Sequence, residues 1–309
     1  MSYIGEKMHR VALISGSANK NLSENVANIL GIKLVETELT TFKDGEVYCR
    51  ILEDIRGKYC FVLQPTCRDV NKNLMELAIL LDAAKRSYAK KIIAVLPYFG
   101  YARQDRQAKE NEPISAKLVA KLIEAAGAER LITIDLHSAQ IEGFFDITIK
   151  HLSAVPLLAE YFSKLKGEDV LIVAPDAGST KRAHSFAKML GSGMAIIDKR
   201  RDRPNEVSEA VLVGDVTNKI CILVDDMIDT AGTITKAAEE LSKKGAKETY
   251  ICATHAVFSD PAIERLEKSK AKEVVVTDTI PHKNLPSKIK VVSVAGIIAD
   301  AIKNMVDEI

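Results

Sequence analysis

The stretch that decides the fold is Ile220–Thr233, with the sequence ICILVDDMIDTAGT. Its first five residues are apolar, which is typical of a buried strand, and two adjacent carboxylates, Asp225 and Asp226, follow them. Small and hydroxyl-bearing residues then occupy Asp229–Thr233, where a helix begins. Such residues at a helix start leave backbone N–H groups available to hold a phosphate. The stretch therefore predicts a strand–loop–helix unit with an anion site; the alternative is a helix cap behind two solvated acids.

The same alternation continues on both sides of this stretch. Strands are predicted at apolar or alternating runs: Val11–Ile14, Glu46–Leu52, Cys60–Leu63, Ile92–Leu96, Leu131–Ile134, Val170–Val173, Met194–Ile197, Tyr250–Ala253 and Val274–Val276. Helical spacing occurs at Leu22–Leu30, Leu74–Ala84, Pro113–Ile123, Leu157–Leu165, Thr180–Leu190, Thr233–Lys243 and Ile297–Met305. Strands that alternate with helices predict an α/β fold with largely parallel sheets.

The length of the chain, 309 residues, favours two domains. The boundary is expected near Lys150, after the short segment Phe145–Ile149. This gives an N-terminal α/β domain over 1–150 and a C-terminal α/β domain over 151–309.

Charge and composition exclude several classes of partner. Lys and Arg number 43 against 42 Asp and Glu, so the formal net charge of +1 gives no strong field for nucleic acid or an anionic membrane. Trp is absent and aromatic residues make up 5%, which disfavours base-stacking platforms. No apolar run has the length of a membrane span or the form of a signal peptide. The five cysteines lack CxxC spacing, which indicates buried thiols in a reducing cytoplasm rather than a zinc site.

A turn in the N-terminal half combines an aromatic face with two carboxylates. Phe42, Asp44 and Glu46 could stack on a nucleotide base and accept a hydrogen bond from its amine. The alternative is a turn in which Asp-Gly joins the two strands of a hairpin. Both interpretations can hold, because turns commonly carry binding sites.

Polar groups also follow three of the predicted strands. Arg103, Gln104 and Asp105 come after a strand and a glycine-containing loop, and Arg103 could pair with a polyphosphate or stack on a base. The alternative for Arg103 is a surface arginine. His137 and Asp176 each lie just past a strand, where a carboxylate could bind Mg²⁺ or one of its waters. Magnesium generally prefers oxygen ligands, and a lone His is more often structural.

The densest basic cluster is Lys199–Arg203, at the end of a predicted strand. Such a run is usually a solvated face. Nucleic-acid binding is a second interpretation, against which the near-zero net charge and the scarce aromatics weigh. No Walker A loop is present, so any nucleotide must be held by other groups.

Taken together, these motifs resemble the ribose-phosphate pyrophosphokinase family, also called phosphoribosyl pyrophosphate synthetases. Val224–Thr233 is similar to the phosphoribosyl pyrophosphate loop of type I phosphoribosyltransferase-fold proteins. The other motifs that carry the resemblance are Phe42–Glu46, Pro97–Arg106, Asp135–His137, Gly143–Asp146, Ala174–Arg182 and Asp198–Arg201. The resemblance covers essentially the whole chain. It implies two type I phosphoribosyltransferase-like domains with largely parallel sheets flanked by helices.

The resemblance also implies an activity, in which the pyrophosphoryl group of Mg-ATP is transferred to the anomeric hydroxyl of ribose 5-phosphate. The products are phosphoribosyl pyrophosphate and AMP. The alternatives are a non-catalytic regulatory subunit of the same family and a phosphoribosyltransferase that consumes phosphoribosyl pyrophosphate. Family members are commonly homo-oligomers, often hexamers, so the expected partners are the small-molecule substrates and further copies of the chain, with no nucleic acid and no membrane.

Roles for individual residues follow from the same resemblance. The ATP-binding residues are expected to be Phe42, Asp44, Glu46, Arg103, Gln104 and Asp105. The ribose 5-phosphate-binding residues are expected to be Asp225, Asp226, Asp229, Thr230, Ala231, Gly232 and Thr233. His137 and Asp176 match metal ligands, and Lys199 and Arg201 match catalytic residues on a flexible loop that closes over the active site. Family members commonly carry glycine where this chain has Ser179.

Overall fold

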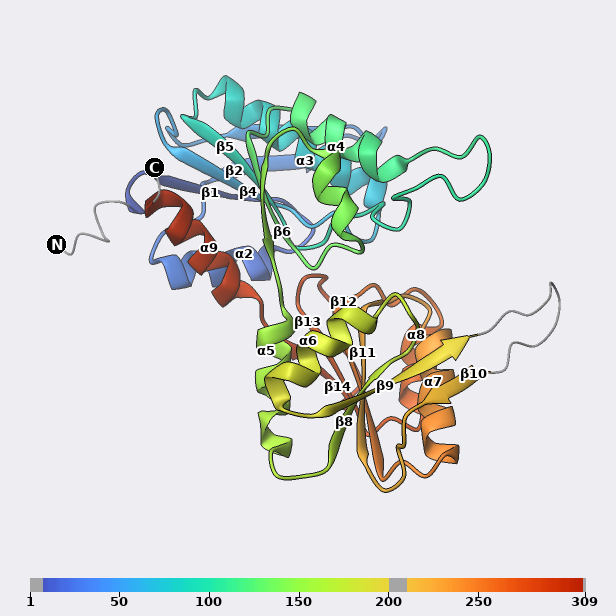
Figure 1. Ribbon diagram of the computed structural model, residues 1–309. Helices are drawn as coiled ribbons and strands as arrows, with labels where there is room; N and C mark the ends of the chain where they lie inside the picture. The colour runs from blue at the N-terminus through green and yellow to red at the C-terminus, as the bar shows by residue number, and fades with distance from the viewer. Residues whose placement is uncertain (1–7, 200–209, 308–309) are drawn as a thin grey trace. The chain divides into compact units, whose positions relative to one another are not determined.

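The computed structural model describes residues 8–199 and 210–307, which divide into two compact units (Figure 1). Of the described residues, unit 1 holds 8–152, 279–281 and 293–307, and unit 2 holds the rest. Each unit is a largely parallel sheet flanked by helices. The predicted α/β class is therefore confirmed.

The sheet of unit 1 has five parallel strands in the order β1-β4-β5-β6-β7. Their bounds are β1 Val11–Ser15, β4 Tyr59–Leu63, β5 Lys91–Leu96, β6 Arg130–Ile134 and β7 Thr148–Leu152. A separate antiparallel hairpin is formed by β2 Thr37–Thr41 and β3 Val47–Ile51. Parallel strands present all their carboxyl ends at one edge, which is where ligands bind in sheets of this kind.

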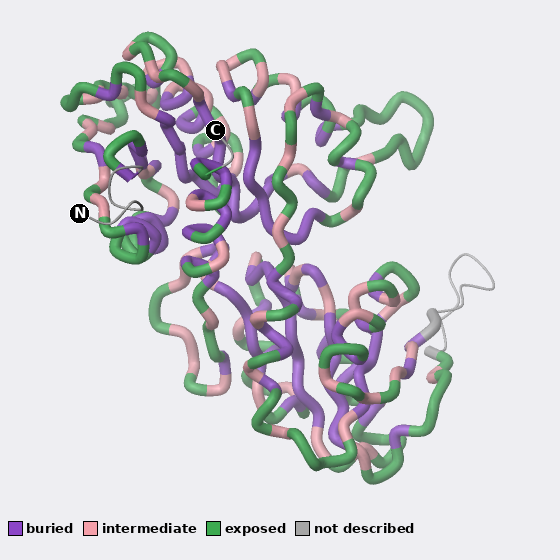
Figure 2. Tube along the Cα trace, turned by 60° about the vertical axis from the view of Figure 1, so that its left-hand side comes forward, coloured by how far each residue is buried: buried purple, intermediate pink, exposed green. Residues whose placement is uncertain are grey.

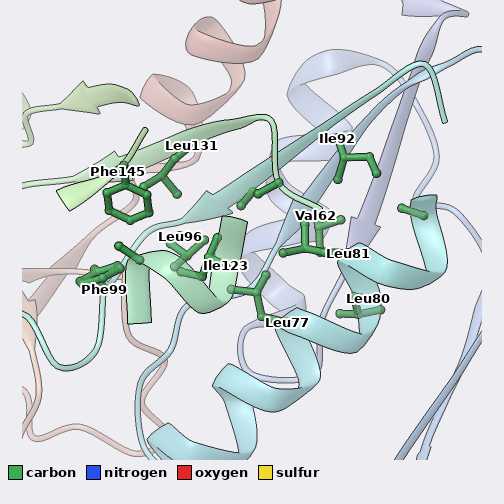
Figure 3. Packing of buried hydrophobic residues seen from close by; sticks show 14 of the residues in the cluster. Val62, Leu77, Leu80, Leu81, Ile92, Leu96, Phe99, Ile123, Leu131 and Phe145 are labelled. Carbon is green, nitrogen blue, oxygen red and sulfur yellow. The ribbon is translucent and has the colours of Figure 1, made fainter. Parts of the chain in front are cut away.

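Helices cover both faces of this sheet. They are α2 Lys20–Leu30, α3 Val70–Arg86, α4 Ser115–Ala125 and α9 Ala295–Asp307, with a 3₁₀ helix η1 at Ala139–Phe144. Figure 3 shows one core layer, where Leu77 and Leu81 of α3 and Ile123 of α4 meet strand residues such as Val62 and Leu96. Burying each such side chain contributes roughly 1.5–3 kcal/mol, so this layer fixes α3 and α4 on the sheet.

The C-terminal helix α9 belongs to unit 1, although the sequence analysis assigned 151–309 to one C-terminal domain. Its apolar stripe, which includes Ile298, Ile302 and Met305, is buried. The stripe of α2 is buried as well, and the two helices pack against each other (Figure 1). The hydrophobic spacing predicted the helix correctly but carried no information about which sheet it would cover.

The sheet of unit 2 has seven strands in the order β10-β9-β8-β11-β12-β13-β14, of which only the edge strand β10 is antiparallel among the described residues. Their bounds are β8 Val170–Ala174, β9 Gly193–Lys199, β10 Ala210–Val213, β11 Ile220–Ile228, β12 Glu248–Ala256, β13 Glu273–Thr277 and β14 Ile289–Val292. The central strands β8, β11, β12 and β13 are almost wholly buried, as the purple tube in Figure 2 shows.

The helices of unit 2 are α5 Val155–Tyr161, α6 Thr180–Leu190, α7 Gly232–Lys243 and α8 Ala262–Lys268, with a 3₁₀ helix η2 at Phe162–Leu165. Phe162 makes edge-to-face contacts with Phe186 of α6 and Tyr250 of β12. A second cluster joins α7 and α8 to the sheet through Ile234 and Leu266. Each face of the sheet is thus covered by its own pair of helices.

Several elements were not predicted from the sequence. The strands β2, β7 and β14 are short and partly exposed, so they lack the continuous apolar run by which buried strands are found. The strand β11 is longer than expected, because Asp225 and Asp226 lie within it rather than after it. No helix in the described residues is long and apolar enough to cross a membrane.

Candidate active site

Three polar residues of unit 2 meet where β8 and β11 run side by side. The strands are paired in parallel, with Val173 opposite Leu223. Asp176, just after β8, therefore lies near Asp225 of β11. The Ser179 hydroxyl is 2.9 Å from Oδ1 of Asp176 and 3.0 Å from Oδ1 of Asp225. The predicted acids are thus brought together at the carboxyl edge of the sheet.

The turn after β8 is held by hydrogen bonds to one carboxylate. The Ser179 N–H donates to Oδ1 of Asp176 over 3.0 Å, so both groups of Ser179 use the same oxygen. Ser179 is buried, whereas Asp176 is half-buried. The hydroxyl of Ser179 therefore fills space that a glycine at this position would leave empty. It also links Asp176 to Asp225, because it lies within hydrogen-bond distance of both carboxylates.

The environment of Asp225 favours its neutral form. Burial, the largest cause, and the charges of Asp226 and Asp176 raise the pKa of Asp225 to about 7. The Asp226 N–H opposes this shift by donating to Oδ1 of Asp225 over 2.9 Å. Asp226 is itself only 8% exposed. A cation or a hydrogen-bond donor placed here would relieve the repulsion among these carboxylates.

The loop after β11 has the form of an anion cradle. Ala231 adopts a left-handed conformation (φ +60°), and α7 starts at Gly232, one residue before the predicted helix. In the part of the chain that the structure describes, no side chain accepts a hydrogen bond from the N–H groups of residues 230–233. The first N–H groups of a helix have no partner within it, so a ligand can use them.

The hairpin of unit 1 presents Phe42, Asp44 and Glu46 in its turn. The Phe42 N–H donates to the Glu46 carbonyl over 2.8 Å, and the Glu46 N–H donates to Oδ1 of Asp44 over 3.2 Å. The Phe42 ring is 54% exposed and contacts Tyr48 edge to face. The hairpin interpretation is correct, and the exposed ring and carboxylates remain available to a ligand.

The residues after β5 are tied to neighbouring elements of unit 1. The Ser115 hydroxyl donates to Oε1 of Gln104 over 2.6 Å, at the start of α4. The Gln140 amide of η1 donates to Oδ2 of Asp105 over 2.6 Å. Arg103 is exposed. Asp105 is thereby linked to the segment that directly follows His137.

His137 lies in a turn past β6 that other side chains hold in place. The Leu136 N–H donates to Nε2 of His151 over 3.0 Å, and Nδ1 of His151 is 2.6 Å from Oε1 of Glu142. The accepting Nε2 fixes the hydrogen of a neutral His151 on Nδ1, facing the carboxylate. Nothing in the sequence pattern singled out His151, because its role depends on the pairing of β6 with β7.

A magnesium ion fits the donor set only if a substrate completes it. In residues 8–199 and 210–307 no group of three or more His, Cys, Asp or Glu side chains could hold a metal ion by itself. Asp176 uses Oδ1 for Ser179, which leaves Oδ2 as an oxygen ligand. Magnesium in phosphoryl-transfer sites is commonly held by one or two protein groups and by substrate phosphates. Asp176 fits that arrangement, and His137, in the other unit, is exposed.

Only one of the two predicted catalytic residues, Lys199, lies among the residues that the structure describes. Lys199 is the last residue of β9. Arg201 and the predicted loop as far as Glu206 lie outside the described residues.

Comparisons with known proteins show the family of the chain. The family described as the N-terminal domain of ribose phosphate pyrophosphokinase matches residues 11–127, and the phosphoribosyl synthetase-associated domain matches residues 201–308. A ribose-phosphate pyrophosphokinase of Caldanaerobacter subterraneus is 54% identical over 293 residues, covering 94% of this chain and 93% of the relative. One from Fusobacterium nucleatum is 51% identical over 298 residues, covering 95% and 94%.

A solved structure extends the likeness to three dimensions. The phosphoribosylpyrophosphate synthetase of Mycobacterium smegmatis superimposes with a TM-score of 0.92 at 41% sequence identity, covering 96% of this chain and 99% of that one. With this coverage the likeness extends over both units. A chain with these two domains and this degree of identity over nearly its whole length belongs to the ribose-phosphate pyrophosphokinase family.

Proposed function

We propose that the protein transfers the pyrophosphoryl group of Mg-ATP to the anomeric hydroxyl of ribose 5-phosphate, giving phosphoribosyl pyrophosphate and AMP. The observation that carries the proposal is the segment β11–α7. It combines two carboxylates, Asp225 and Asp226, with a loop whose N–H groups are not used by side chains. Family membership supports the same activity.

The reaction forms one bond and breaks one. The anomeric oxygen bonds to the β-phosphorus of ATP, and the bond from that phosphorus to the oxygen bridging the α-phosphate breaks. The electron pair of the broken bond stays on the oxygen of AMP, and the anomeric hydroxyl loses its proton. Little covalent chemistry is left to the protein, so its task is to position the substrates and to stabilise charge.

Within unit 2, Asp225 and Asp226 accept hydrogen bonds from the ribose hydroxyls. The residues Asp229, Thr230, Ala231, Gly232 and Thr233 enclose the 5-phosphate with their N–H groups and hydroxyls. The exposed N-terminus of α7 favours an anion at this position. The geometry of the loop therefore matches a phosphorylated sugar better than a free one.

The ATP-binding groups belong to unit 1. Phe42 stacks on the adenine, while Asp44 and Glu46 accept from its amine. Arg103 pairs with the phosphates, and Gln104 and Asp105 hold the segment that carries it. The exposure of the Phe42 ring supports this assignment, since a buried ring could not reach a ligand.

Cations complete the site. Lys199 and Arg201 stabilise the charge that develops on the departing AMP oxygen and on the transferred phosphates. Asp176 of unit 2 and His137 of unit 1 would each offer a ligand to Mg²⁺, and the bound metal would neutralise negative charge on the substrate phosphates. The acidic cluster around Asp176 supports a divalent cation.

The protein acts as a homo-oligomer, and a hexamer is the form expected from the family. The reaction takes place in the cytoplasm, with ATP and ribose 5-phosphate as the small-molecule partners. The free thiols Cys49, Cys60, Cys67, Cys221 and Cys252 are compatible with a reducing compartment.

The decisive experiment is incubation of the purified protein with Mg²⁺, ATP and ribose 5-phosphate, followed by separation of the nucleotides. We expect equal amounts of AMP and phosphoribosyl pyrophosphate, and no turnover after chelation of the metal. Formation of ADP in place of AMP would refute pyrophosphoryl transfer. Turnover that continues under chelation would refute the role of magnesium.

Two alternatives give different results in the same assay. A regulatory subunit would form no AMP alone but would alter the rate of an active relative. A phosphoribosyltransferase would consume phosphoribosyl pyrophosphate together with a base and would not need ATP. The presence of His137, Asp176, Lys199, Arg201 and Asp226 in one chain favours the synthetase over both.

A further inference from the structure

The loop proposed to enclose the 5-phosphate, residues 229–233, contains no positively charged side chain. Residues 220–235 contain no Lys or Arg, whereas Asp225, Asp226 and Asp229 all lie in this segment. A phosphate dianion placed there is close in the chain to Asp226 and Asp229, and to Asp225, which is only partly ionised at neutral pH because its pKa is raised to about 7. Like charges at short range repel each other strongly, and helix N–H groups offset only part of that repulsion. A cation from another element near the loop would reduce it further.

Arg265 of α8 reaches this loop. Its Nη1 donates to the Thr230 carbonyl over 3.0 Å. A Cβ atom placed on Gly232 would lie 3.3 Å from the same nitrogen, so the guanidinium borders the first residue of α7. Packing between α7 and α8, which both contribute to one hydrophobic cluster, fixes the distance between the loop and the arginine.

Among the described residues Arg265 forms no ion pair within α8, although its charge, after that of Lys268, contributes to lowering the pKa of Glu264. Its neighbour Glu264 is paired with Lys268 over 2.5 Å, one helical turn further on. No carboxylate among the described residues lies within ion-pair distance of the Arg265 guanidinium. An arginine has five N–H donors, and only one of them is engaged by Thr230.

We propose that Arg265 is a positioning residue for the 5-phosphate of ribose 5-phosphate, a role that rests on the function proposed above. Its hydrogen bond turns the Thr230 carbonyl toward α8, so that the oxygen does not oppose the phosphate. Its charge offsets the carboxylates that flank the loop. The bond to Thr230 holds the guanidinium beside the loop, where that charge is effective.

Substitutions can separate the charge from the hydrogen bond. Arg265→Gln keeps an amide donor but loses the charge, and Arg265→Lys keeps the charge but loses the planar fork. Lys268→Gln is the matched control, because it removes one positive charge from the same helix on a residue paired with Glu264. Thermal unfolding of all three variants checks that the fold is retained.

For Arg265→Gln we expect the Michaelis constant for ribose 5-phosphate to rise by about tenfold to a hundredfold, because the attraction between two unit charges a few ångströms apart at a protein surface is of that order. The turnover number and the Michaelis constant for ATP should stay within about twofold of the wild type. Arg265→Lys should recover most of the affinity, and Lys268→Gln should behave as the wild type.

Calorimetric titration with ribose 5-phosphate and with inorganic phosphate, without ATP, gives a second readout. Both should bind less tightly to Arg265→Gln than to Lys268→Gln. This readout survives even if the wild-type protein forms no AMP, in which case only the proposed reaction is refuted. Equal affinities in Arg265→Gln and Lys268→Gln would overturn the role of Arg265. Equal losses in Arg265→Lys and Arg265→Gln would overturn the role of its charge.

Discussion

The segment β1–α2 of unit 1 and the segment β11–α7 of unit 2 are built alike but use their backbone N–H groups differently. In unit 1 the Ser17 N–H donates to Oε1 of Glu76 over 2.6 Å, and the Ser17 hydroxyl donates to Oε2 over 2.7 Å. The Ala18 N–H donates to Oε1 of Gln64 over 3.1 Å. The cradle of unit 1 is therefore filled by side chains of its own unit.

In unit 2 no carboxylate of the described residues takes that place. The residue Glu76 is only 2% exposed, and a Cβ atom on Gly16 would lie 2.2 Å from Oε1 of Gln64, so nothing larger fits in the cradle of unit 1. The loop over 229–233 has no such occupant among the described side chains. One strand–loop–helix motif thus serves stability in unit 1 and is available to substrate in unit 2.

The largest effect should come from removing the cations that act on the substrate held by unit 2. Lys199→Ala and Arg201→Ala should each lower the turnover number by about 10²–10³, roughly 3–4 kcal/mol, because cations at developing charge act mainly on the transition state. The Michaelis constants should move little. Arg203→Ala is the control and should do much less. A large rise in the Michaelis constant for ATP at unchanged turnover would instead assign the cluster to substrate binding.

The second expected effect tests whether the Glu76 side chain, which accepts hydrogen bonds in the loop after β1, stabilises unit 1. Glu76→Ala removes the acceptor of three donors, namely the N–H and hydroxyl of the exposed Ser17 and the amide of the buried Gln64. Because water can replace the acceptor only at Ser17, we expect a loss of about 1–3 kcal/mol in the free energy of unfolding, measured by urea denaturation. Glu76→Gln keeps one acceptor oxygen and should cost less. A variant as stable as the wild type would contradict the idea that the cradle is occupied for stability.

The pKa of Asp225 gives a pH test of the acidic side of unit 2. Because the folded-state pKa is about 7 and the ordinary value is 3.8, the folded protein keeps a proton that the unfolded chain releases. Stability should therefore fall as the pH rises from about 4 to about 7 and then level off. In metal-free buffer, Asp225→Asn should remove this slope and gain about 4 kcal/mol at pH 8 relative to pH 4. If stability depends on pH in the same way in Asp225→Asn and in the wild type, then Asp225 of the folded protein is ionised over this whole pH range.

The smallest expected effect tests whether the ATP-binding and sugar-binding groups of one active site come from two copies of the chain. If the ATP groups of one copy serve the sugar site of another, mixing Asp44→Ala with Asp226→Ala protein under subunit exchange should restore part of the activity. The reason for this expectation is the homo-oligomer proposed above, together with the position of the proposed ATP groups in unit 1 and of the sugar groups in unit 2. Separate assays of each variant, at the same total concentration, provide the baseline. Full activity in a strictly monomeric protein would exclude the shared site.

The sequence predicted a structural feature correctly where all the residues that form the feature lie in one segment of the chain. The apolar run before Asp225 predicted a buried central strand, and the Asp-Gly turn near Phe42 predicted a hairpin. The small residues after the acids predicted the start of a helix, because these features are adjacent in the chain.

Features that depend on distant pairing could not be predicted. Asp176 meets Asp225 through Ser179 because β8 pairs with β11, although β9 and β10 lie between them in the chain. Glu76 and Arg265 look like ordinary helix-surface charges in the sequence. Only the packing of their helices brings one to the cradle of unit 1 and the other to the loop of unit 2.

The position of α9 has a consequence for the order in which the protein is made. Helix α2 leaves the ribosome before unit 2, and α9, which packs against it, follows all of unit 2 in the chain. During translation unit 2 can therefore close its core while α2 still lacks the helix that packs against it. Until α9 emerges, the surface of α2 that contacts it stays exposed to chaperones and to other nascent chains.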